Sequence, residues 1–400
     1  MEFEVRSETL EMGAPVSIVV VGAGGGGSNA VNRMVECGID GVKFIAVNTD
    51  LQALRKNRAP VKLQIGSQVT GGMGAGGDPS IGEKAALEDK EQIAKILEGA
   101  NMVFITAGMG GGTGTGSAPV IAQIAKSLGA LTVGVVTKPF DFEKNYRMDL
   151  AEKGIEKLRE AVDSLIVIPN QRILNNVDRK TSIPDAFRKV DDILRQGVQG
   201  ISDGIMENGY INIDFADVKS VMKDQGDAYM TIGYGAGENR IEEAISSALD
   251  NPLLEDISIK GATRALVYVA GSGELPIVEY QEILERITAD MDKNARITIG
   301  TYLDPALEDK LRVTVIATGF DTHQEIKELT LIKSHNGEVI SGKEFDNFTG
   351  NILNPDIIPP RTPRDGYKYV NEDLDVPTLI RDKCRFINFD DETLPNVQFN

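Results

Sequence analysis

The residues best suited to chemistry form a run of five glycines, two threonines and a serine, Gly110–Ser117. The run follows an apolar segment, 102–106, that is typical of a buried strand, and it precedes a segment that reads as a helix start. Glycine loses much backbone freedom when it is ordered, so such a cluster predicts a chain that bends sharply or lies against a ligand. Backbone N–H groups at a helix N-terminus bind anions without a basic side chain. The run therefore predicts a phosphate-binding loop.

Two further glycine-rich segments, Gly22–Gly27 and Gly71–Pro79, lie earlier in the chain. The first fits the dinucleotide pattern GxGxxG after a strand, and Asp50 ends the next strand, where a ribose-binding acid belongs. This loop alone supports a dinucleotide site and another nucleotide site equally. A dinucleotide's pyrophosphate needs only one glycine-rich loop, not three. Three loops at the carboxyl ends of parallel strands would converge on one crevice, and that many backbone N–H donors suit a triphosphate. An NAD-dependent dehydrogenase remains the alternative.

An acidic segment, Asn212–Asp217, carries two carboxylates three residues apart. Such a pair suits a hard cation or the orientation of a water molecule. The alternative is a helix N-terminus, with Asp214 as the cap and Asp217 in the first turn. From these residues alone, the helix cap is the favoured interpretation.

The alternation of strands and helices from residue 16 predicts a doubly wound, mainly parallel α/β sheet. A run of apolar residues every three or four positions predicts a long central helix over 184–208. A second, smaller α/β pattern follows, and beyond Phe320 weak periodicity and a cluster of prolines over 355–363 indicate an extended tail. We expect six parts: an N-terminal extension (1–15), a nucleotide-binding domain (16–183), the central helix (184–208), a second domain with the acidic segment (209–320), a linker (321–371) and a terminal peptide with its tail (372–400).

The composition excludes several classes of protein. The chain has 42 basic and 60 acidic residues and a net charge of −18, which argues against nucleic-acid or anionic-membrane binding. Its two cysteines, Cys37 and Cys384, lie far apart and favour a reducing compartment over a disulfide framework. No apolar run approaches the roughly 18 residues of a membrane span, and residues 1–15 do not read as a signal peptide. We expect a cytoplasmic protein without direct membrane insertion.

The glycine run Gly110–Ser117 resembles the signature of the tubulin/FtsZ family of GTPases. Other segments resemble the bacterial FtsZ proteins of that family in order and spacing: Gly24–Asn29, Asn48–Asp50, Gly74–Pro79, Thr137–Phe140 and Asn212–Asp217. The resemblance covers roughly residues 16–320. It extends to Asp373–Arg381, which is similar to the family's terminal partner-binding peptide.

This resemblance implies a GTPase that converts GTP to GDP and phosphate and that assembles head to tail into protofilaments of a mid-cell division ring. Asp214 and Asp217, supported by Asn212, would polarise the attacking water in the neighbouring subunit's nucleotide site. Mg²⁺ would be held mainly by phosphates and water, with no protein side chain assigned as a ligand, and Asp50 would support the cation's waters. Asp373–Arg381 would bind division-ring adaptor or regulator proteins. A GTP-binding scaffold without hydrolysis is the second alternative.

The resemblance also assigns individual ligand contacts. Glu143 and Arg147 would contact the sugar and phosphates, although their spacing equally allows an i,i+4 ion pair. Asn170 and Asp191 would read guanine, and Phe187 would stack on the base or pack in the core. The remaining positions fall in the phosphate loops and the Asn48–Asp50 motif: Gly25, Gly26, Gly27, Ser28, Asn29, Asn48, Ala75, Gly76, Gly77, Gly112, Thr113 and Gly114. Three residues depart from the family pattern and are expected to affect packing or subunit faces: Thr231, Gly235 and Tyr268.

Overall fold

The computed structural model describes residues 16–174, 180–206, 209–249, 259–273 and 275–320, and the strands at 332–333 and 339–340. The chain divides into two compact units, Met1–Phe320 and Asp321–Asn400. In the second unit, β12 (Ile332–Lys333) and β13 (Val339–Ile340) pair as antiparallel strands. The expected N-terminal extension, the Asp373–Arg381 peptide and the tail after it lie outside the described residues, as does most of the expected linker.

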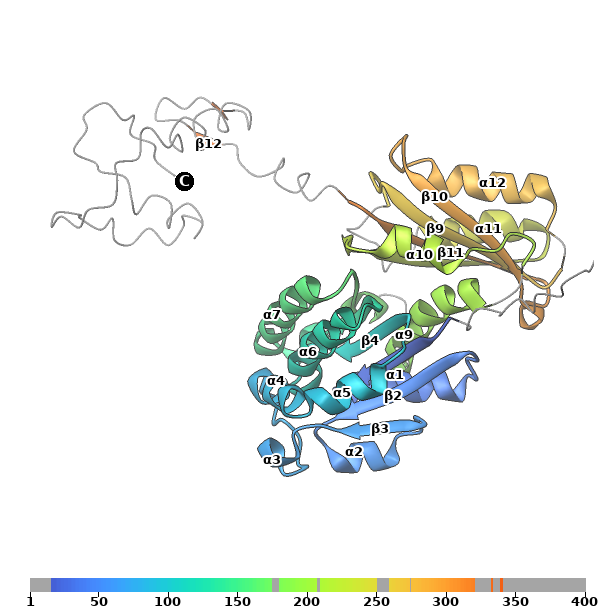
Figure 1. The fold of residues 1–400 in the computed structure, drawn as a ribbon. Coiled ribbons are helices and arrows are strands. Elements are labelled where there is room, and N and C mark those ends of the chain that lie inside the picture. The colour runs from blue at the N-terminus through green and yellow to red at the C-terminus, as the bar shows by residue number, and fades with distance from the viewer. Residues whose placement is uncertain are drawn as a thin grey trace, which may run out of the picture. The chain divides into compact units, whose positions relative to one another are not determined.

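A seven-stranded parallel sheet forms the first part of the first unit, in the order β3-β2-β1-β4-β5-β6-β7 (Figure 1). Its central strands are continuous apolar runs because helices cover both faces, as is typical of parallel sheets. Alternate residues of β1 face two separate cores, Val20 on one side and Val19 and Val21 on the other. The strands are β1 (Ile18–Ala23), β2 (Val42–Asn48), β3 (Val61–Gln64), β4 (Met102–Gly108), β5 (Leu131–Lys138), β6 (Ser164–Pro169) and β7 (Gly226–Asp227).

The helices between these strands complete the doubly wound arrangement that the sequence predicts. They are α1 (Gly24–Glu36), α2 (Leu51–Lys56), α3 (Ser67–Thr70), α4 (Pro79–Glu88), α5 (Lys90–Leu97), α6 (Thr113–Ser127), α7 (Asn145–Ala161) and α8 (Asn170–Leu174), with a 3-10 turn η1 (Asp141–Glu143). In the residues that the structure describes, no helix has the length and apolar character that crossing a bilayer requires.

The long helix α9 (Ile183–Met206) lies where the apolar repeat predicts one, and its buried residues include Leu194 and Ile201. One continuous core joins the first sheet, α9 and a second sheet, which Figure 1 shows beyond α9. That sheet has the order β10-β9-β11-β8, with β9 and β10 parallel and β11 antiparallel to both its neighbours. Its elements, with those around it, are α10 (Phe215–Met222), β8 (Tyr229–Ala236), η2 (Gly237–Asn239), α11 (Arg240–Leu249), β9 (Arg264–Gly271), α12 (Ile277–Thr288), β10 (Arg296–Leu303), η4 (Pro305–Leu307) and β11 (Lys310–Thr318).

The fold class predicted from the sequence is confirmed, but some element boundaries are not. The helices expected after the glycine loops begin inside them, α1 at Gly24 and α6 at Thr113. The segment 79–97, which precedes β4, forms two helices, α4 and α5, with a break at Asp89. The carboxylate of Asp89 accepts hydrogen bonds from Gly66 N at 2.7 Å and Gln92 Nε2 at 2.6 Å, which bind it to a neighbouring loop. Tertiary contacts of this kind override local helix propensity.

Candidate functional site

The three glycine-rich segments meet at one edge of the first sheet. β1 and β4 are neighbours, and the strand order reverses between them, which is where ligands bind in open α/β sheets. A Cβ atom on Gly24 would lie 2.6 Å from the backbone nitrogen of Gly114, so the first and second loops touch through their backbones. A Cβ on Gly112 would lie 2.9 Å from Ala75, which brings in the third segment. The predicted convergence of the loops is therefore present.

Two helices begin at this meeting point, and neither has a side-chain cap. α1 starts at Gly24 and α6 at Thr113, and the preceding residues, Ala23 and Gly112, have no polar side chain that could cap the first turn. The first N–H groups of a helix have no partner within the helix, and the helix dipole adds partial positive charge there. Two uncapped N-termini at one edge of the sheet therefore present N–H groups of the kind that bind anionic oxygens.

The two threonines of the glycine run have different roles. Thr115 Oγ1 accepts a hydrogen bond from Gly110 N at 2.8 Å and so shapes the loop itself. Thr113 Oγ1 lies 2.6 Å from Thr49 Oγ1 in a buried hydrogen bond. Thr113 therefore ties the second loop to the Asn48–Asp50 segment, a contact that spacing alone does not reveal.

The candidate phosphate-loop residues differ in exposure. Gly25, Gly26 and Asn29 are exposed, whereas Gly27, Ser28 and Ala75 are buried, and the buried Ser28 hydroxyl has no hydrogen-bond partner among the described residues. Gly76 and Gly77 have φ angles of 60° and 82°, and a Cβ on either would meet open space. Glycine is thus required at both positions by the backbone conformation rather than by crowding.

Asp50 and Asn48 support the same edge of the sheet. Asp50 caps α2, since its Oδ1 accepts hydrogen bonds from Gln52 N at 2.8 Å and Ala53 N at 3.1 Å. The buried Asn48 side chain accepts one from Asp50 N at 3.3 Å. Both residues therefore have structural roles beside the glycine loops.

Glu143 and Arg147 form the i,i+4 ion pair that their spacing allows, with Arg147 Nη1 2.5 Å from Glu143 Oε2. The pair also lies at the glycine run, because Arg147 Nε is 3.4 Å from the Gly110 carbonyl oxygen. Glu143 Oε1 accepts a hydrogen bond from Phe140 N at 2.9 Å. The two interpretations of this pair are therefore compatible.

The Phe140 ring contacts one of the candidate base-binding residues, Phe187. It packs edge-to-face against Phe187 of α9, with ring centroids 5.2 Å apart, and Phe187 is 40% exposed rather than part of the core. Asn170 is buried, and its Oδ1 has no hydrogen-bond partner among the described residues. Burial raises the pKa of Asp191 to about 7, against the opposing effect of Arg33. A buried acceptor without a partner is costly, so an exposed ring together with the Asn170 oxygen and the partly buried Asp191 carboxyl suits an aromatic ligand that carries N–H donors.

The acidic segment forms the helix cap that the sequence favours. Asp214 Oδ1 accepts a hydrogen bond from Asp217 N at 2.8 Å, and Asn212 Oδ1 accepts one from Gly209 N at 2.7 Å. The carboxylate of Asp217 is 42% exposed, and its Oδ1 lies 3.9 Å from Arg296 Nη2. Within the described chain, the side chains of Asn212, Asp214 and Asp217 make no hydrogen bond or ion pair with the glycine loops. The structure does not unite the two halves of the expected site in one subunit.

No group of three or more His, Cys, Asp or Glu side chains is arranged to hold a metal ion within the described residues.

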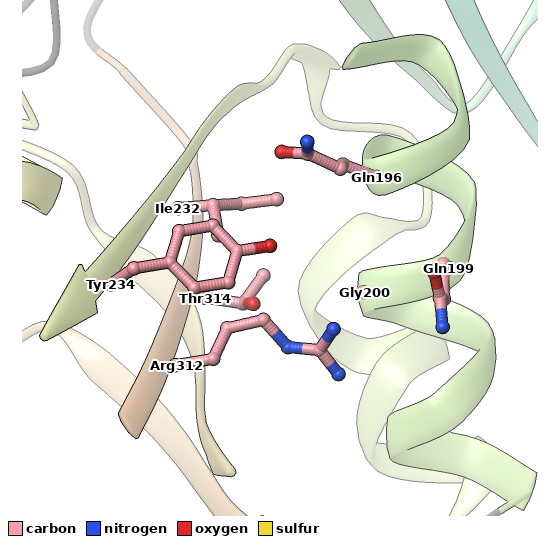
Figure 2. A pocket seen from close by; sticks show the side chains of 7 residues that line it. All are labelled: Gln196, Gln199, Gly200, Ile232, Tyr234, Arg312 and Thr314. Atoms are coloured by element: carbon pink, nitrogen blue, oxygen red, sulfur yellow. The ribbon is translucent and has the colours of Figure 1, made fainter. Parts of the chain in front are cut away.

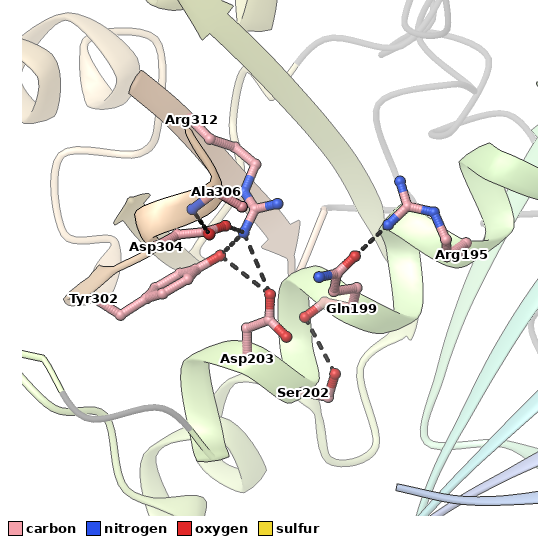
Figure 3. A network of polar contacts seen from close by, with 8 residues as sticks. All are labelled: Arg195, Gln199, Ser202, Asp203, Tyr302, Asp304, Ala306 and Arg312. Atoms are coloured by element: carbon pink, nitrogen blue, oxygen red, sulfur yellow. Dashed lines mark hydrogen bonds and ion pairs between the residues drawn. The ribbon is translucent and has the colours of Figure 1, made fainter. Parts of the chain in front are cut away.

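A second polar region joins α9 to the second sheet, and no motif in the sequence predicts it. Figure 2 shows a narrow pocket there, into which Tyr234 and Arg312 project. Arg312 Nη2 lies 3.3 Å from carboxylate oxygens of both Asp203 and Asp304, and it also contacts the Tyr302 hydroxyl. Figure 3 shows these side chains turned toward one another. Desolvation raises the pKa of Tyr302. These contacts hold α9 against β10 and β11.

Tyr268, one of the departures from the family pattern, is buried against α9. A Cβ on Gly204 would lie 1.9 Å from Tyr268 Cε1, so the ring occupies the space that the missing side chain leaves. Its role is in packing.

Comparison with known proteins decides the family. Residues 17–178 match the GTPase domain of the tubulin/FtsZ family, and residues 226–321 match the C-terminal domain of the FtsZ family. The structure of an empty FtsZ dimer from M. jannaschii is 45% identical, with a TM-score of 0.73, over 79% of this chain and 90% of that one. The chain belongs to the FtsZ family. The dehydrogenase alternative has no support among these matches.

More distant likeness extends to the CetZ proteins of Haloferax volcanii. CetZ2, in a GTPγS-bound protofilament, is 18% identical with a TM-score of 0.64 over 77% of this chain and 94% of that one. CetZ1, a GDP-bound monomer, is 22% identical with a TM-score of 0.65 over 78% and 97%. At these identities the likeness shows a common fold. In this FtsZ-family chain, the acidic segment lies between the two matched domains.

Proposed function

We propose that this FtsZ-family chain binds GTP, hydrolyses it to GDP and phosphate, and polymerises head to tail, with each active site completed by the next subunit. One observation carries the proposal: the glycine loops meet at two uncapped helix N-termini, while the exposed acidic segment makes its polar contacts elsewhere. Head-to-tail stacking would bring the acidic segment of one subunit to the loops of another. Hydrolysis would then depend on assembly.

In the proposed site, the uncapped N-termini of α1 and α6 bind the phosphates, with Gly112, Thr113 and Gly114 beside the γ-phosphate. Gly25 to Asn29 lie along the other phosphates, and the loop Ala75 to Gly77 lies near the terminal one. Mg²⁺ would be held by phosphate oxygens and water, with Asp50 near those waters. Asn170 and Asp191 read the guanine edge, and Phe187 stacks on the ring.

The acidic residues contribute the orientation of the attacking water. Phosphoryl transfer requires the attacking water to lie in line with the bond that breaks. A carboxylate that accepts a hydrogen bond from this water orients it and takes its proton. Asp217 has an exposed carboxylate, whereas one oxygen of Asp214 is already used by the helix cap. We therefore assign the water's proton to Asp217, with the second carboxylate oxygen of Asp214 helping to polarise the water and Asn212 supporting the segment.

Two matched structures support self-association. The M. jannaschii protein is an FtsZ dimer, and the CetZ2 protein forms a protofilament. We further propose that the filaments of this chain build a cytoplasmic division ring at mid-cell and that Asp373–Arg381 binds its adaptor proteins. Deletion of 373–381 should abolish adaptor binding and leave GTP turnover unchanged.

The test of the shared site is Asp217→Ala, compared with Asp40→Ala at an exposed turn before β2. Phosphate release and GTP-dependent sedimentation are measured over a range of protein concentrations. We expect turnover with a critical concentration in the wild type and in D40A, and retained GTP binding with lost turnover in D217A. Turnover in D217A that scales linearly with protein concentration would refute the shared site, and wild-type filaments without phosphate release would indicate the scaffold alternative.

A further inference from the structure

The C-terminal end of α10, the helix that begins at the acidic segment, is held by three side chains from three different strands. An α-helix leaves its last carbonyl groups without partners inside the helix. In α10 three such carbonyls accept side-chain hydrogen bonds: Ser220 from Arg264 Nη1, Val221 from Thr318 Oγ1 at 2.8 Å, and Met222 from Ser164 Oγ.

These donors come from both sheets. Ser164 begins β6 in the first sheet, whereas Arg264 begins β9 and Thr318 ends β11 in the second. Ser164 and Thr318 are fully buried, so their bonds are shielded from water. Hydrogen bonds in such surroundings are stronger, and a carbonyl that loses its buried donor is costly to leave unpaired.

The chain that leaves α10 is anchored to the first sheet as well. The Asp163 carbonyl accepts hydrogen bonds from Gln225 N at 2.8 Å and Gly226 N at 3.0 Å. Lys126 Nζ lies 3.2 Å from Asp163 Oδ1 and 3.0 Å from Asp224 Oδ1. The C-terminal end of α10 is therefore held by strands of both sheets, and the residues that follow it are bound to Asp163 and Lys126.

α10 has only eight residues, and isolated helices of that length are not stable in water. Its position is set by what holds it, and Ser220 lies less than one turn from Asp217. We propose that Arg264, Ser164 and Thr318 are positioning residues for the catalytic segment, acting through the carbonyls of α10. The proposal rests on the proposed function, in which Asp217 serves the next subunit.

Arg264 gives the clearest test because it is half-buried and its long side chain reaches across from β9. In the parallel pair β9–β10 it stands opposite Arg296, whose guanidinium lies near Asp217. One arginine thus holds the far end of α10 while its neighbour faces the acidic end.

The experiment compares Arg264→Met, Arg264→Lys and a matched control, Arg240→Met, which removes an arginine that pairs with Glu279 between α11 and α12. Steady-state GTP turnover is measured on polymers, and GTP affinity is measured below the critical concentration. We expect R264M to lower kcat threefold or more with unchanged GTP affinity, R264K to recover most of kcat, and R240M to match the wild type. Wild-type kcat in R264M, or equal losses in R264M and R264K, would overturn the proposal.

Thr318 provides a second variant pair if R264M folds poorly. Thr318→Val keeps the shape but removes the donor, and Thr318→Ser keeps the donor. We expect lower kcat in T318V than in T318S at equal GTP affinity; equal kcat in the two would count against the proposal.

Mixing separates failure of this inference from failure of the shared site. Asp191→Ala damages the base-reading end and leaves the acidic end intact. If the site is shared, D217A mixed with D191A turns over faster than the two alone, and R264M mixed with D191A behaves likewise. No gain with D217A refutes the shared site. A gain with D217A but none with an impaired R264M refutes the positioning role alone.

Discussion

The charge state of Asp191 should control the pH dependence of nucleotide binding. Burial raises the pKa of this carboxyl to about 7, and Arg33 opposes part of that rise. Only the carboxylate accepts hydrogen bonds from both the N1–H and the N2–H₂ groups of guanine. With a pKa of about 7, roughly one-tenth of the empty protein carries that charge at pH 6 and roughly nine-tenths at pH 8. GTP affinity should therefore rise about tenfold between these pH values.

The same shift has a consequence for stability. Raising the pKa from 3.8 to about 7 destabilises the folded state by about 4 kcal/mol once the carboxyl is ionised. The folded pKa lies above the unfolded one, so this loss is absent below about pH 4 and complete above about pH 7. Asp191→Asn should then be more stable than the wild type at pH 8, with no difference at low pH, as measured by urea unfolding.

The assay is calorimetric titration of GTP into wild type and D191N at pH 6, 7 and 8, below the critical concentration and at fixed ionic strength. The phosphates of the nucleotide also titrate near pH 6, but they do so equally in both proteins. The difference between the two pH profiles therefore reports Asp191. D191N should bind GTP weakly with a flatter profile, and parallel profiles in the two proteins would refute the reasoning.

Three further substitutions test packing, the polar network and the helix cap. Gly204→Ala should lower the free energy of unfolding by about 1–3 kcal/mol through overlap with the Tyr268 ring, and Tyr268→Leu in the same chain should recover part of the loss, as measured in urea. Arg312→Met should lower the free energy of unfolding by about 3 kcal/mol or more, because the buried carboxylate of Asp203 loses an ion-pair partner. In thermal unfolding, the double variant R312M/D203N should lose less stability than R312M, and losses that simply add would contradict this reasoning. Asp214→Ala should cost about 1 kcal/mol, whereas Asp214→Ser should keep the cap and the stability but still lower GTP turnover; full turnover in D214S would leave Asp214 only a structural role.

Local patterns in the sequence predicted the parts of the fold that depend on them. The alternation of apolar strands and amphipathic helices gave the parallel sheet, and the periodic apolar face of α9 gave the long helix. The cap at Asp214 was also a local signal, since cap and first turn are only three residues apart. α7 escaped detection because its buried face consists largely of small residues, such as Ala151, Gly154 and Ala161, which form a weak apolar stripe.

Contacts between distant segments were not predictable in this way. Gly27 and Gly116 fall in runs that are typical of ligand-binding loops. However, a Cβ on Gly27 would lie 2.1 Å from the Thr106 carbonyl oxygen, and a Cβ on Gly116 would lie 2.0 Å from the Pro79 carbonyl oxygen. These glycines are needed for close packing of one backbone on another. The hydrogen bond from Arg264 to the Ser220 carbonyl likewise joins residues 44 positions apart, and no periodic pattern of residue types in the sequence predicts it.

Because the glycine loops are locked to one another by backbone contacts, most of their conformational entropy is lost when the chain folds, not when nucleotide binds. Binding to such a prepared surface should need little loop rearrangement, so association should be fast and differences in affinity should appear in the dissociation rate. The same rigidity leaves the nucleotide end little freedom to adapt to a neighbour. Adjustment during assembly would then fall to the subunit that brings the acidic segment.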